Sequence, residues 1–489
     1  MKPLKKIPFF LFLLVFFFCL HGWLENYDFI SSSEVLFTGL FIFFGMLLLT
    51  AILFLFTKKL LHASLITFFI ALWYLFFGAM HDWVKSISFL SFFKRYPVIV
   101  ITLLLFTLTW VIFMKFRKNL HIKLELYINL LLLIYCFIDV FLLIKIQFAK
   151  PEEWVADVVK FDTAKVIQKP DVYFLLFDGY PGTASLKDSF DFSNDSLQNY
   201  FTAHSFKALP VFANYDLTYF SMSSMFNLQY VKDDFDNLHL TQRDFQKRGV
   251  EINHAAIFPI FKSMGYAISN FSIFEIDNKP SLSKENSFLL AHSILLTDKI
   301  LHNRLQRDIG DRLCRIIPFW KSSDFYQHSI DNKFAENDLL RTAAQKKSSP
   351  QFVYAHFMMP HGPYYFDSLG NKNPFEMISH YTRWDDKELF VSYLKYINNR
   401  MFSMVDTIIS HDPAAIIIVM SDHGFRSYNS TALYQPFRYD NLCMVRLPDN
   451  KHAAMKNKWS NVNLFRYIFN CEFGQNMPYL ADSSVLLGY

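Results

Sequence analysis

Three apolar runs of the chain end directly in side chains that can bind a metal ion. Residues 172–177 are followed by Asp178-Gly179-Tyr180, residues 352–359 by Pro360-His361-Gly362, and residues 415–420 by Ser421-Asp422-His423-Gly424. Carboxylate oxygen and imidazole nitrogen together suit zinc or manganese. Each motif alone says little, because an Asp-Gly after a strand is ordinarily a turn and a single histidine there is ordinarily structural. The coincidence of three favours a metal site.

A fourth segment, which contains Thr218, supplies a hydroxyl group that could also take part in the chemistry. A short strand-like stretch from Phe212 gives way to a helical pattern that starts near Thr218. A hydroxyl at a helix N-terminus lies at the positive end of the macrodipole, which favours the alkoxide, and a metal ion alongside would lower its pKa further. Thr218 could equally be an N-cap, and the pattern leaves both interpretations open. Ser221, Ser223 and Ser224 are expected to serve helix packing.

The elements that must position these residues are those of an α/β domain. Five short apolar runs alternate with longer amphipathic segments: residues 172–177, 266–274, 352–359, 415–420 and 442–447. Near-continuous apolar strands separated by helical stretches predict a mostly parallel sheet with helices on both faces. Ligands of such sheets gather at the carboxyl ends of the strands, which is where the motifs stand.

The motifs together resemble a known family. The strand ending in Asp-Gly-Tyr, the Leu-Thr-Tyr-Phe-Ser helix start at Thr218, Met-Pro-His-Gly-Pro-Tyr around His361 and Ser-Asp-His-Gly-Phe-Arg around Asp422 resemble the sulfatase-like branch of the alkaline phosphatase superfamily. The resemblance covers residues 171–489. In layout, an apolar N-terminal half before such a domain is similar to lipoteichoic acid synthase and to the phosphoethanolamine transferases of the bacterial envelope.

The resemblance implies a role for each motif residue. Asp178, Asp422 and His423 would be metal ligands, and Thr218 would be both the nucleophile and a ligand. His361 would contact the transferred group or the leaving oxygen.

Arg426 and His356 stand near these motifs but are not assigned to the site. Arg426 stands close enough to the Asp-His-Gly motif to support the site, but no role is assigned to it. His356 lies five residues before His361, on the strand itself, and alternation along a strand would turn it to the opposite side. We therefore expect His356 to be structural.

Two departures from the family narrow the chemistry. Formylglycine sulfatases carry Cys or Ser in a Cys-x-Pro-x-Arg setting, whereas Thr218 is followed by Tyr, Phe, Ser and Met, which disfavours sulfate-ester hydrolysis. The opening motif also carries one acid, Asp178, so a single divalent ion, Mn²⁺ or Zn²⁺, is expected instead of two.

The first part of the chain predicts membrane-spanning helices. Crossing the hydrocarbon core takes roughly 20 mostly apolar residues. Five stretches qualify or nearly qualify: residues 7–24, 35–56, 62–80, 97–114 and 124–144. The first could instead be a signal peptide, but no small-residue cleavage site follows it. The predicted organisation is a transmembrane domain at 1–149, a linker at 150–169 and a catalytic domain at 170–489.

Lysine and arginine set the expected orientation. The segments predicted to be cytoplasmic carry Lys2, Lys5 and Lys6, then Lys58 and Lys59, then Lys115, Arg117, Lys118 and Lys123. With the N-terminus inside, five spans place the catalytic domain on the outer, periplasmic side of a bacterial inner membrane. Asp139, inside the fifth apolar run, is expected to pair within the bundle.

Bulk composition excludes other classes. The formal net charge of +5 is small for 489 residues and is spread out, so no nucleic-acid partner is expected. None of the five cysteines has CxxC spacing, which argues against a thiolate zinc site, and Cys314, Cys443 and Cys471 leave room for one disulfide at most.

The sequence thus predicts a metal-dependent transferase or hydrolase. It would move a phospho-linked head group from a lipid donor to an envelope glycan, a lipid or water through a phosphorylated Thr218. One alternative is a sulfatase or phosphodiesterase acting on small esters. Another is a membrane scaffold with a degenerate enzyme domain. The donor, the acceptor, the metal and the oligomeric state stay open.

Overall fold

The structure is a computed structural model of the whole chain. It describes residues 8–27, 29–116, 120–148, 159–232, 235–282, 293–316, 326–378, 386–426, 436–449, 452 and 458–488. The chain divides into two compact units, one formed by Met1–Glu153 with Glu285–Leu313 and the other by Trp154–Lys284 with Cys314–Tyr489. A segment from the second half of the chain therefore belongs to the first unit.

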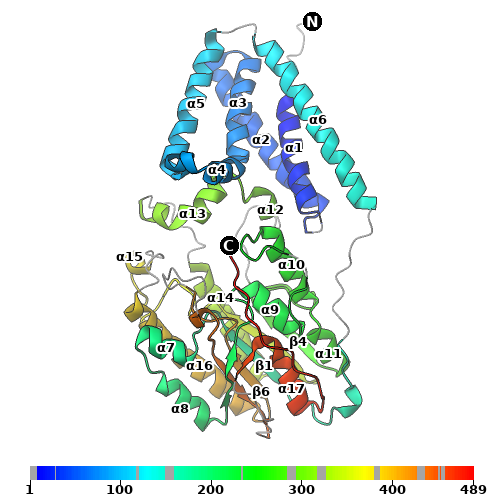
Figure 1. The fold of residues 1–489 in the computed structure, drawn as a ribbon, viewed down its shortest axis with the longest axis vertical. Coiled ribbons are helices and arrows are strands. Elements are labelled where there is room, and N and C mark those ends of the chain that lie inside the picture. Colours follow the sequence, from blue (N-terminus) through cyan, green and yellow to red (C-terminus); the bar gives the residue numbers. More distant parts are fainter. Residues whose placement is uncertain are drawn as a thin grey trace. The chain divides into compact units, whose positions relative to one another are not determined.

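Packed helices make up the first unit (Figure 1). In chain order they are α1 (Phe9–Glu25), α2 (Ser32–Thr57), α3 (Leu60–Leu75), α4 (Phe77–Ser86), the short η1 (Ser88–Lys94), α5 (Tyr96–Phe116) and α6 (Leu120–Phe148). Among the described residues, α2, α5 and α6 are long and apolar enough to cross a membrane. The pair α3 and α4, bent by 58°, is a fourth candidate if the two helices are one span.

The predicted count of five spans is not confirmed, because α1 falls short. Its 17 residues reach about 25 Å, less than the hydrocarbon thickness of about 30 Å. The side chains of Phe10, Leu11 and Leu14 are fully buried against neighbouring helices, whereas α2 and α6 direct large apolar side chains such as Phe44 and Phe137 outward. Helix α1 thus buries a larger share of its side chains than α2 does, although Phe9, Phe12 and Phe16 form an exposed stripe along it.

The orientation predicted from charges stays a prediction. Lys2, Lys5, Lys6, Arg117 and Lys118 lie outside the described residues, as does most of the first half of the predicted linker, 150–158. Asp139, expected to pair inside the bundle, does so: its Oδ2 atom is 3.1 Å from Nδ1 of His21 on α1.

Helices α12 (Ile294–Thr297) and α13 (Leu301–Ile316) complete the first unit. Leu301, Leu305 and Ile309 recur at every fourth position of α13 and pack against an apolar cluster of α4 and α5. Beside them the buried Arg304 contacts Asp82 of α4 and Asp308. One apolar stripe and one buried cation hold α13 in this unit.

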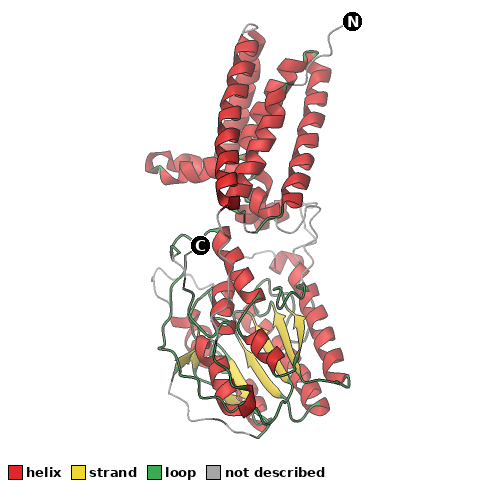
Figure 2. Ribbon diagram, turned by 90° about the vertical axis from the view of Figure 1, so that its right-hand side faces the viewer, coloured by secondary structure: helices red, strands yellow, loops and turns green. Residues whose placement is uncertain are grey.

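A six-stranded mixed sheet forms the centre of the second unit, in the order β2-β7-β6-β1-β5-β4 (Figure 2). The strands are β1 (Val172–Phe177), β2 (Lys207–Ala208), β4 (Ala267–Phe271), β5 (Gln351–Phe357), β6 (Ile416–Met420) and β7 (Cys443–Arg446). All five predicted runs form strands. The four strands β6, β1, β5 and β4 are parallel, while β7 runs antiparallel to β6, so the sheet is less uniformly parallel than predicted.

Helices cover both faces of this sheet, as predicted. One apolar core holds side chains of α9 (Thr218–Phe226), α11 (Ile257–Ser263) and α17 (Leu464–Glu472). The core on the other face holds side chains of α7 (Thr183–Phe190), α8 (Asp195–Ala203), α14 (Gln327–Ala344) and α16 (Lys387–His411). Strand β1 lies between the two cores and is buried at every position, so its carboxyl end is a rigid place from which to present a side chain.

Smaller elements also contribute side chains to these two cores. They are α10 (Gln242–Asn253), α15 (Phe375–Ile378) and a two-stranded pair of β3 (Val211–Phe212) with β8 (Trp459–Ser460). Cys443 and Cys471 are free thiols, and the side chain of Cys314 lies outside the described residues.

Phe226 ties the helix α9 to the sheet, and its removal tests this packing. Its buried ring lies 5.8 Å from that of Phe174 and 5.2 Å from that of Tyr354, measured between ring centroids. We expect Phe226→Ala to destabilise the second unit by about 3–5 kcal/mol, because it leaves a cavity that the sheet cannot close. Thermal unfolding in detergent measures the loss. The exposed Phe334→Ala on α14 is the control, and equal losses in both variants would contradict the packing described.

Candidate active site

The carboxyl ends of β1 and β6 bring two predicted site residues together. Leu176 of β1 pairs in parallel with Met420 of β6. Two residues further along each strand stand Asp178 and Asp422, and His423 follows directly. All three side chains are buried. The adjacency therefore follows from strand register, although the two acids are far apart in the chain.

Thr218, the first residue of α9, completes the cluster. Its Oγ1 atom lies 3.3 Å from Oδ2 of Asp178 and 3.4 Å from Nε2 of His423. Nε2 of His423 is 3.2 Å from Oδ2 of Asp422 and 3.8 Å from Oδ1 of Asp178. The ligand atoms of the two aspartates and His423 all lie within 4.8 Å of one another.

Thr218 is not the cap of its helix. Leu217 holds the N-cap position in an extended conformation, and no side chain caps this helix end. The Thr218 hydroxyl donates its hydrogen to Asp178, and its oxygen accepts no hydrogen bond from the N–H groups at the start of the helix. Of the two interpretations that the sequence left open, the geometry therefore fits the one in which the hydroxyl faces the cluster.

A hydrogen bond from Ser221 of α9 holds this helix against the residues that follow β6. Oγ of Ser221 donates to the carbonyl oxygen of Asp422 at 2.6 Å, and Nδ2 of Asn461 donates to the same oxygen at 2.9 Å. Ser223 and Ser224 bond instead to Glu251 and to the Gln229 carbonyl, as packing residues would. The expectation that Ser221 only packs the helix is incomplete, because it fixes Thr218 relative to Asp422.

The orientation of His423 suits metal binding. Its Nδ1 atom is 2.7 Å from the carbonyl oxygen of Gly424. A carbonyl oxygen can only accept, so Nδ1 carries the hydrogen, and Nε2 of the neutral ring presents its lone pair to Asp178, Asp422 and Thr218. Such an outer hydrogen bond fixes the tautomer and orientation of histidines that ligate metals.

The cluster fits a divalent cation. Oδ1 of Asp178 and Oδ2 of Asp422 are buried and have no hydrogen-bond partner within the described part of the chain. Two buried carboxylates without an opposite charge are costly. Two carboxylates, one imidazole and one hydroxyl form a set of four donors that Zn²⁺ or Mn²⁺ accepts.

Electrostatics keep Asp178 ionised. Burial alone would raise the pKa of its carboxyl, but the imidazoles of His356, His361 and His423 outweigh burial, and the pKa lies well below its usual range. A carboxylate that stays charged at neutral pH can hold a cation without first losing a proton.

His356 lies beside Asp178, contrary to the expectation that it faces the opposite side. Its buried Nε2 atom is 3.5 Å from Oδ2 of Asp178, and its Nδ1 is 3.0 Å from the Tyr354 hydroxyl. The expectation counted alternation back from His361, but β5 ends at Phe357, where the alternation stops. In the structure His356 pairs with Leu176 of β1, and paired residues of parallel strands face the same side of the sheet. This register cannot be read from the sequence.

Two further histidines stand near Asp178. His361 follows β5 and its Nδ1 donates to the Gly362 carbonyl at 2.8 Å. Burial lowers its pKa, and the charge of Arg426 lowers it further. His328 of α14 lies 6.3 Å from His361 between ring centroids, and burial lowers its pKa to about 4. Nothing in the sequence singled out His328, because a lone helical histidine carries no motif.

Several solved structures are similar to this chain at low identity. The C-terminal periplasmic domain of EcEptC from Escherichia coli is 9% identical with a TM-score of 0.40, and the match covers 69% of this chain and 94% of that one. The same domain has been solved in complex with Zn. The phosphonate monoester hydrolase of Agrobacterium radiobacter is 12% identical with a TM-score of 0.36, covering 62% of this chain and 73% of that one.

A sulfatase is also among the similar structures. BT1596, a 2-O GAG sulfatase, is 11% identical with a TM-score of 0.37, and the match covers 65% of this chain and 73% of that one. No protein-family model and no curated protein matches the sequence. At this distance the likenesses assign no activity to the chain.

Loss of one carboxylate tests the predicted metal ligands. We expect Asp422→Asn to weaken binding of Zn²⁺ or Mn²⁺ by at least about 100-fold, since it removes a charged ligand atom and not merely an outer contact. Metal content per chain after chelation and reloading, measured by mass spectrometry, reports the loss. The exposed Asp406→Asn is the matched control, and full occupancy in both variants would rule out Asp422 as a ligand.

His328 and His361 predict that the metal-free protein is sensitive to acid. Because the folded-state pKa of each lies below the ordinary value, the unfolded chain binds more protons as pH falls below about 6.5. Stability should therefore fall between pH 6.5 and pH 4, and His328→Gln should flatten that slope. Thermal unfolding at several pH values measures it. The variant His254→Gln, at an exposed position, should keep the original slope, and a slope unchanged by His328→Gln would refute the assignment.

Proposed function

We propose that the protein is a metal-dependent enzyme that transfers a phospho-linked head group from a membrane lipid to an envelope acceptor or to water. The observation that supports this most directly is the position of the Thr218 hydroxyl. It lies 3.3 and 3.4 Å from two candidate metal ligands, Asp178 and His423, in a buried cluster. A hydroxyl placed in this way has the setting of an activated nucleophile.

Asp178, Asp422 and His423 would hold the ion, with Thr218 as a fourth donor. When bound, such an ion supplies positive charge that favours the alkoxide and neutralises the phosphoryl oxygens. The chain contributes the rest: Ser221 positions α9, and Gly424 fixes the tautomer of His423.

The proposed reaction has two balanced steps. In the first, the Thr218 oxygen forms a bond to phosphorus while the bond from phosphorus to the lipid alcohol oxygen breaks. The Thr218 hydroxyl loses its proton to solvent, and the departing alcohol oxygen takes up a proton from solvent. In the second, an acceptor hydroxyl forms a bond to phosphorus, the bond from Thr218 to phosphorus breaks, and a proton returns to Thr218.

His361 suits the second step. Its lowered pKa keeps the ring neutral at pH 7, and its Nδ1 hydrogen is donated to the Gly362 carbonyl. Nε2 therefore carries the lone pair and can take the proton of the incoming hydroxyl. The positive charge of Arg426, close enough to act on His361, would favour a phosphoryl oxygen nearby.

Apolar helices of the first unit support a membrane setting. Three or four of them have the length and composition of spans. We propose that the chain is a multi-pass protein of a bacterial inner membrane with the second unit on its outer side. This setting gives the enzyme phospholipids as donors and envelope glycans or lipids as acceptors.

A covalent adduct tests the proposal. Full-length protein in detergent is incubated with bacterial phospholipid extract and Mn²⁺ or Zn²⁺, and peptide mass spectra are recorded. We expect a phosphoglycerol or phosphoethanolamine adduct on Thr218, its loss in Thr218→Ala, and its partial return in Thr218→Ser, because serine keeps the hydroxyl.

Ser224→Ala is the matched control, since Ser224 lies on the same helix and bonds only to the Gln229 carbonyl. It should form the adduct as the wild type does. If the wild type binds metal without an adduct, soluble phosphate and sulfate esters are tested next, and turnover of either would indicate a hydrolase. With neither metal nor adduct, the transferase proposal fails and a scaffold role takes its place.

A further inference from the structure

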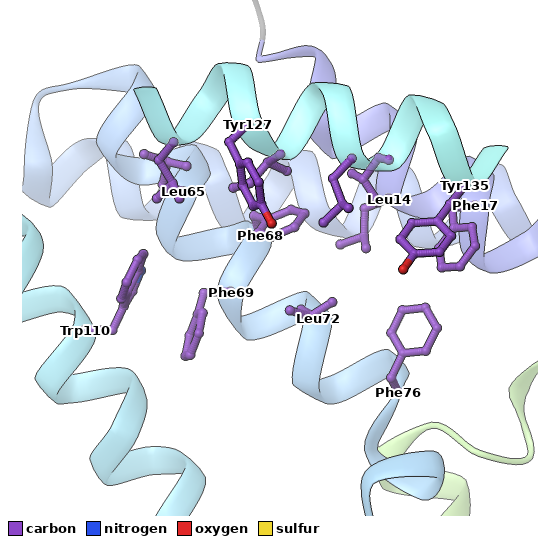
Figure 3. A pocket seen from close by; sticks show the side chains of 14 residues that line it. Leu14, Phe17, Leu65, Phe68, Phe69, Leu72, Phe76, Trp110, Tyr127 and Tyr135 are labelled. Atoms are coloured by element: carbon purple, nitrogen blue, oxygen red, sulfur yellow. The ribbon is translucent and has the colours of Figure 1, made fainter. Parts of the chain in front are cut away.

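The first unit contains a cavity of 410 Å³ between α1, α3, α5 and α6 (Figure 3). Most of its walls come from α3 and α6, which face each other across it, while Leu14 and Phe17 come from α1 and Trp110 from α5. The proposed chemistry at Thr218 makes no use of this cavity.

The cavity is elongated along the helices. Its wall residues on α6 run from Leu124 to Tyr135 with helical spacing, and those on α3 run from Leu65 to Phe76. Each set spans twelve residues, or eleven steps of about 1.5 Å, which is about 16 Å of helix axis. The cavity is therefore a slot whose long axis follows the helices that would cross the bilayer.

The walls offer almost no polar group. No charged side chain lines the cavity among the described residues, and its polar atoms belong to Trp110, Tyr127 and Tyr135. The Trp110 ring stacks on Phe69 with centroids 5.3 Å apart. A cavity with such walls does not retain water, which needs two to four polar partners.

The slot opens onto the surface that would face lipid. Among its wall residues, Tyr127 is 62% exposed and Tyr135 is 48% exposed. Exposed apolar side chains of α5 and α6, such as Leu105 and Ile138, continue this surface outside the slot. The hydrocarbon of a surrounding bilayer would therefore be continuous with the interior of the slot.

A polar group of residues stands beyond one end. Phe17 and Tyr135 meet at that end with ring centroids 5.5 Å apart. One turn further along the same helices, His21 lies 3.1 Å from Asp139. Next to them, Nζ of Lys299 is 3.7 Å from Glu25, and its side chain is half exposed. Polar side chains thus follow the apolar slot, as a polar head group follows the apolar chains of a phospholipid, and each basic side chain among them is paired with a carboxylate.

We propose that the slot binds one acyl chain of a phospholipid, with the polar head group toward the end marked by His21 and Lys299. Burial from water does not drive this binding, because lipid tails are as apolar as the walls; packing against the aromatic walls does. The inference deepens the proposed function, on which its catalytic meaning rests, because it names the part of the lipid donor that the first unit retains.

Photochemical labelling tests the slot. Full-length protein in liposomes of phosphatidylglycerol, a fraction of it carrying a diazirine at mid-chain, is irradiated and digested for mass spectrometry. We expect labels concentrated on the α3 and α6 peptides that line the slot. Leu72→Trp, which fills the slot, should reduce this labelling about fivefold or more. Leu133→Trp, at an exposed position of α6 that does not line the slot, is the matched control and should leave it unchanged.

Two results would overturn the inference: labels spread evenly over the exposed faces of α2 and α5, or equal labelling of Leu72→Trp and Leu133→Trp. A Thr218 adduct formed without preferential labelling would likewise reject the slot and leave the proposed function standing. Preferential labelling without a Thr218 adduct would support the slot and reject the proposed function.

Discussion

The candidate site depends on one electrostatic constraint, the burial of two carboxylates next to each other. Asp178 and Asp422 can lie side by side only because β1 and β6 are adjacent parallel strands in a fixed register. Their repulsion must be offset by positive charge, and one oxygen atom of each carboxylate has no hydrogen-bond partner among the described residues and is left to bind a cation. Helix α9 and its hydroxyl are then placed relative to that charge by Ser221.

Much of this arrangement could be predicted from the sequence. Unbroken apolar runs identify β1, β5 and β6, and the residues after each run identify most of the site, because strand ends of one direction share an edge. His356 and His328 could not be found in this way. One faces the site through strand pairing, and the other reaches it from a helix that begins more than a hundred residues after Asp178. The antiparallel β7 also leaves no mark in its composition.

The helices of the first unit could likewise be predicted only in part. Composition locates the helices within a few residues, since apolar length is what a bilayer requires. It does not distinguish a helix with many buried side chains, such as α1, from one that is mostly exposed, such as α2, because both are rich in Phe and Leu. The bend between α3 and α4 is equally hidden, and with it the number of crossings.

Glu285–Leu313 belongs to the first unit, although the residues before and after it belong to the second. The chain therefore passes between the two units three times. A soluble fragment that starts at Trp154 would therefore carry α13 without the surface that covers Leu301, Leu305 and Ile309. Such a fragment would present a bare amphipathic helix to solvent and would tend to self-associate. Replacing residues 285–313 by a short polar loop, in contrast to simple truncation, would give a secreted form suited to crystallisation.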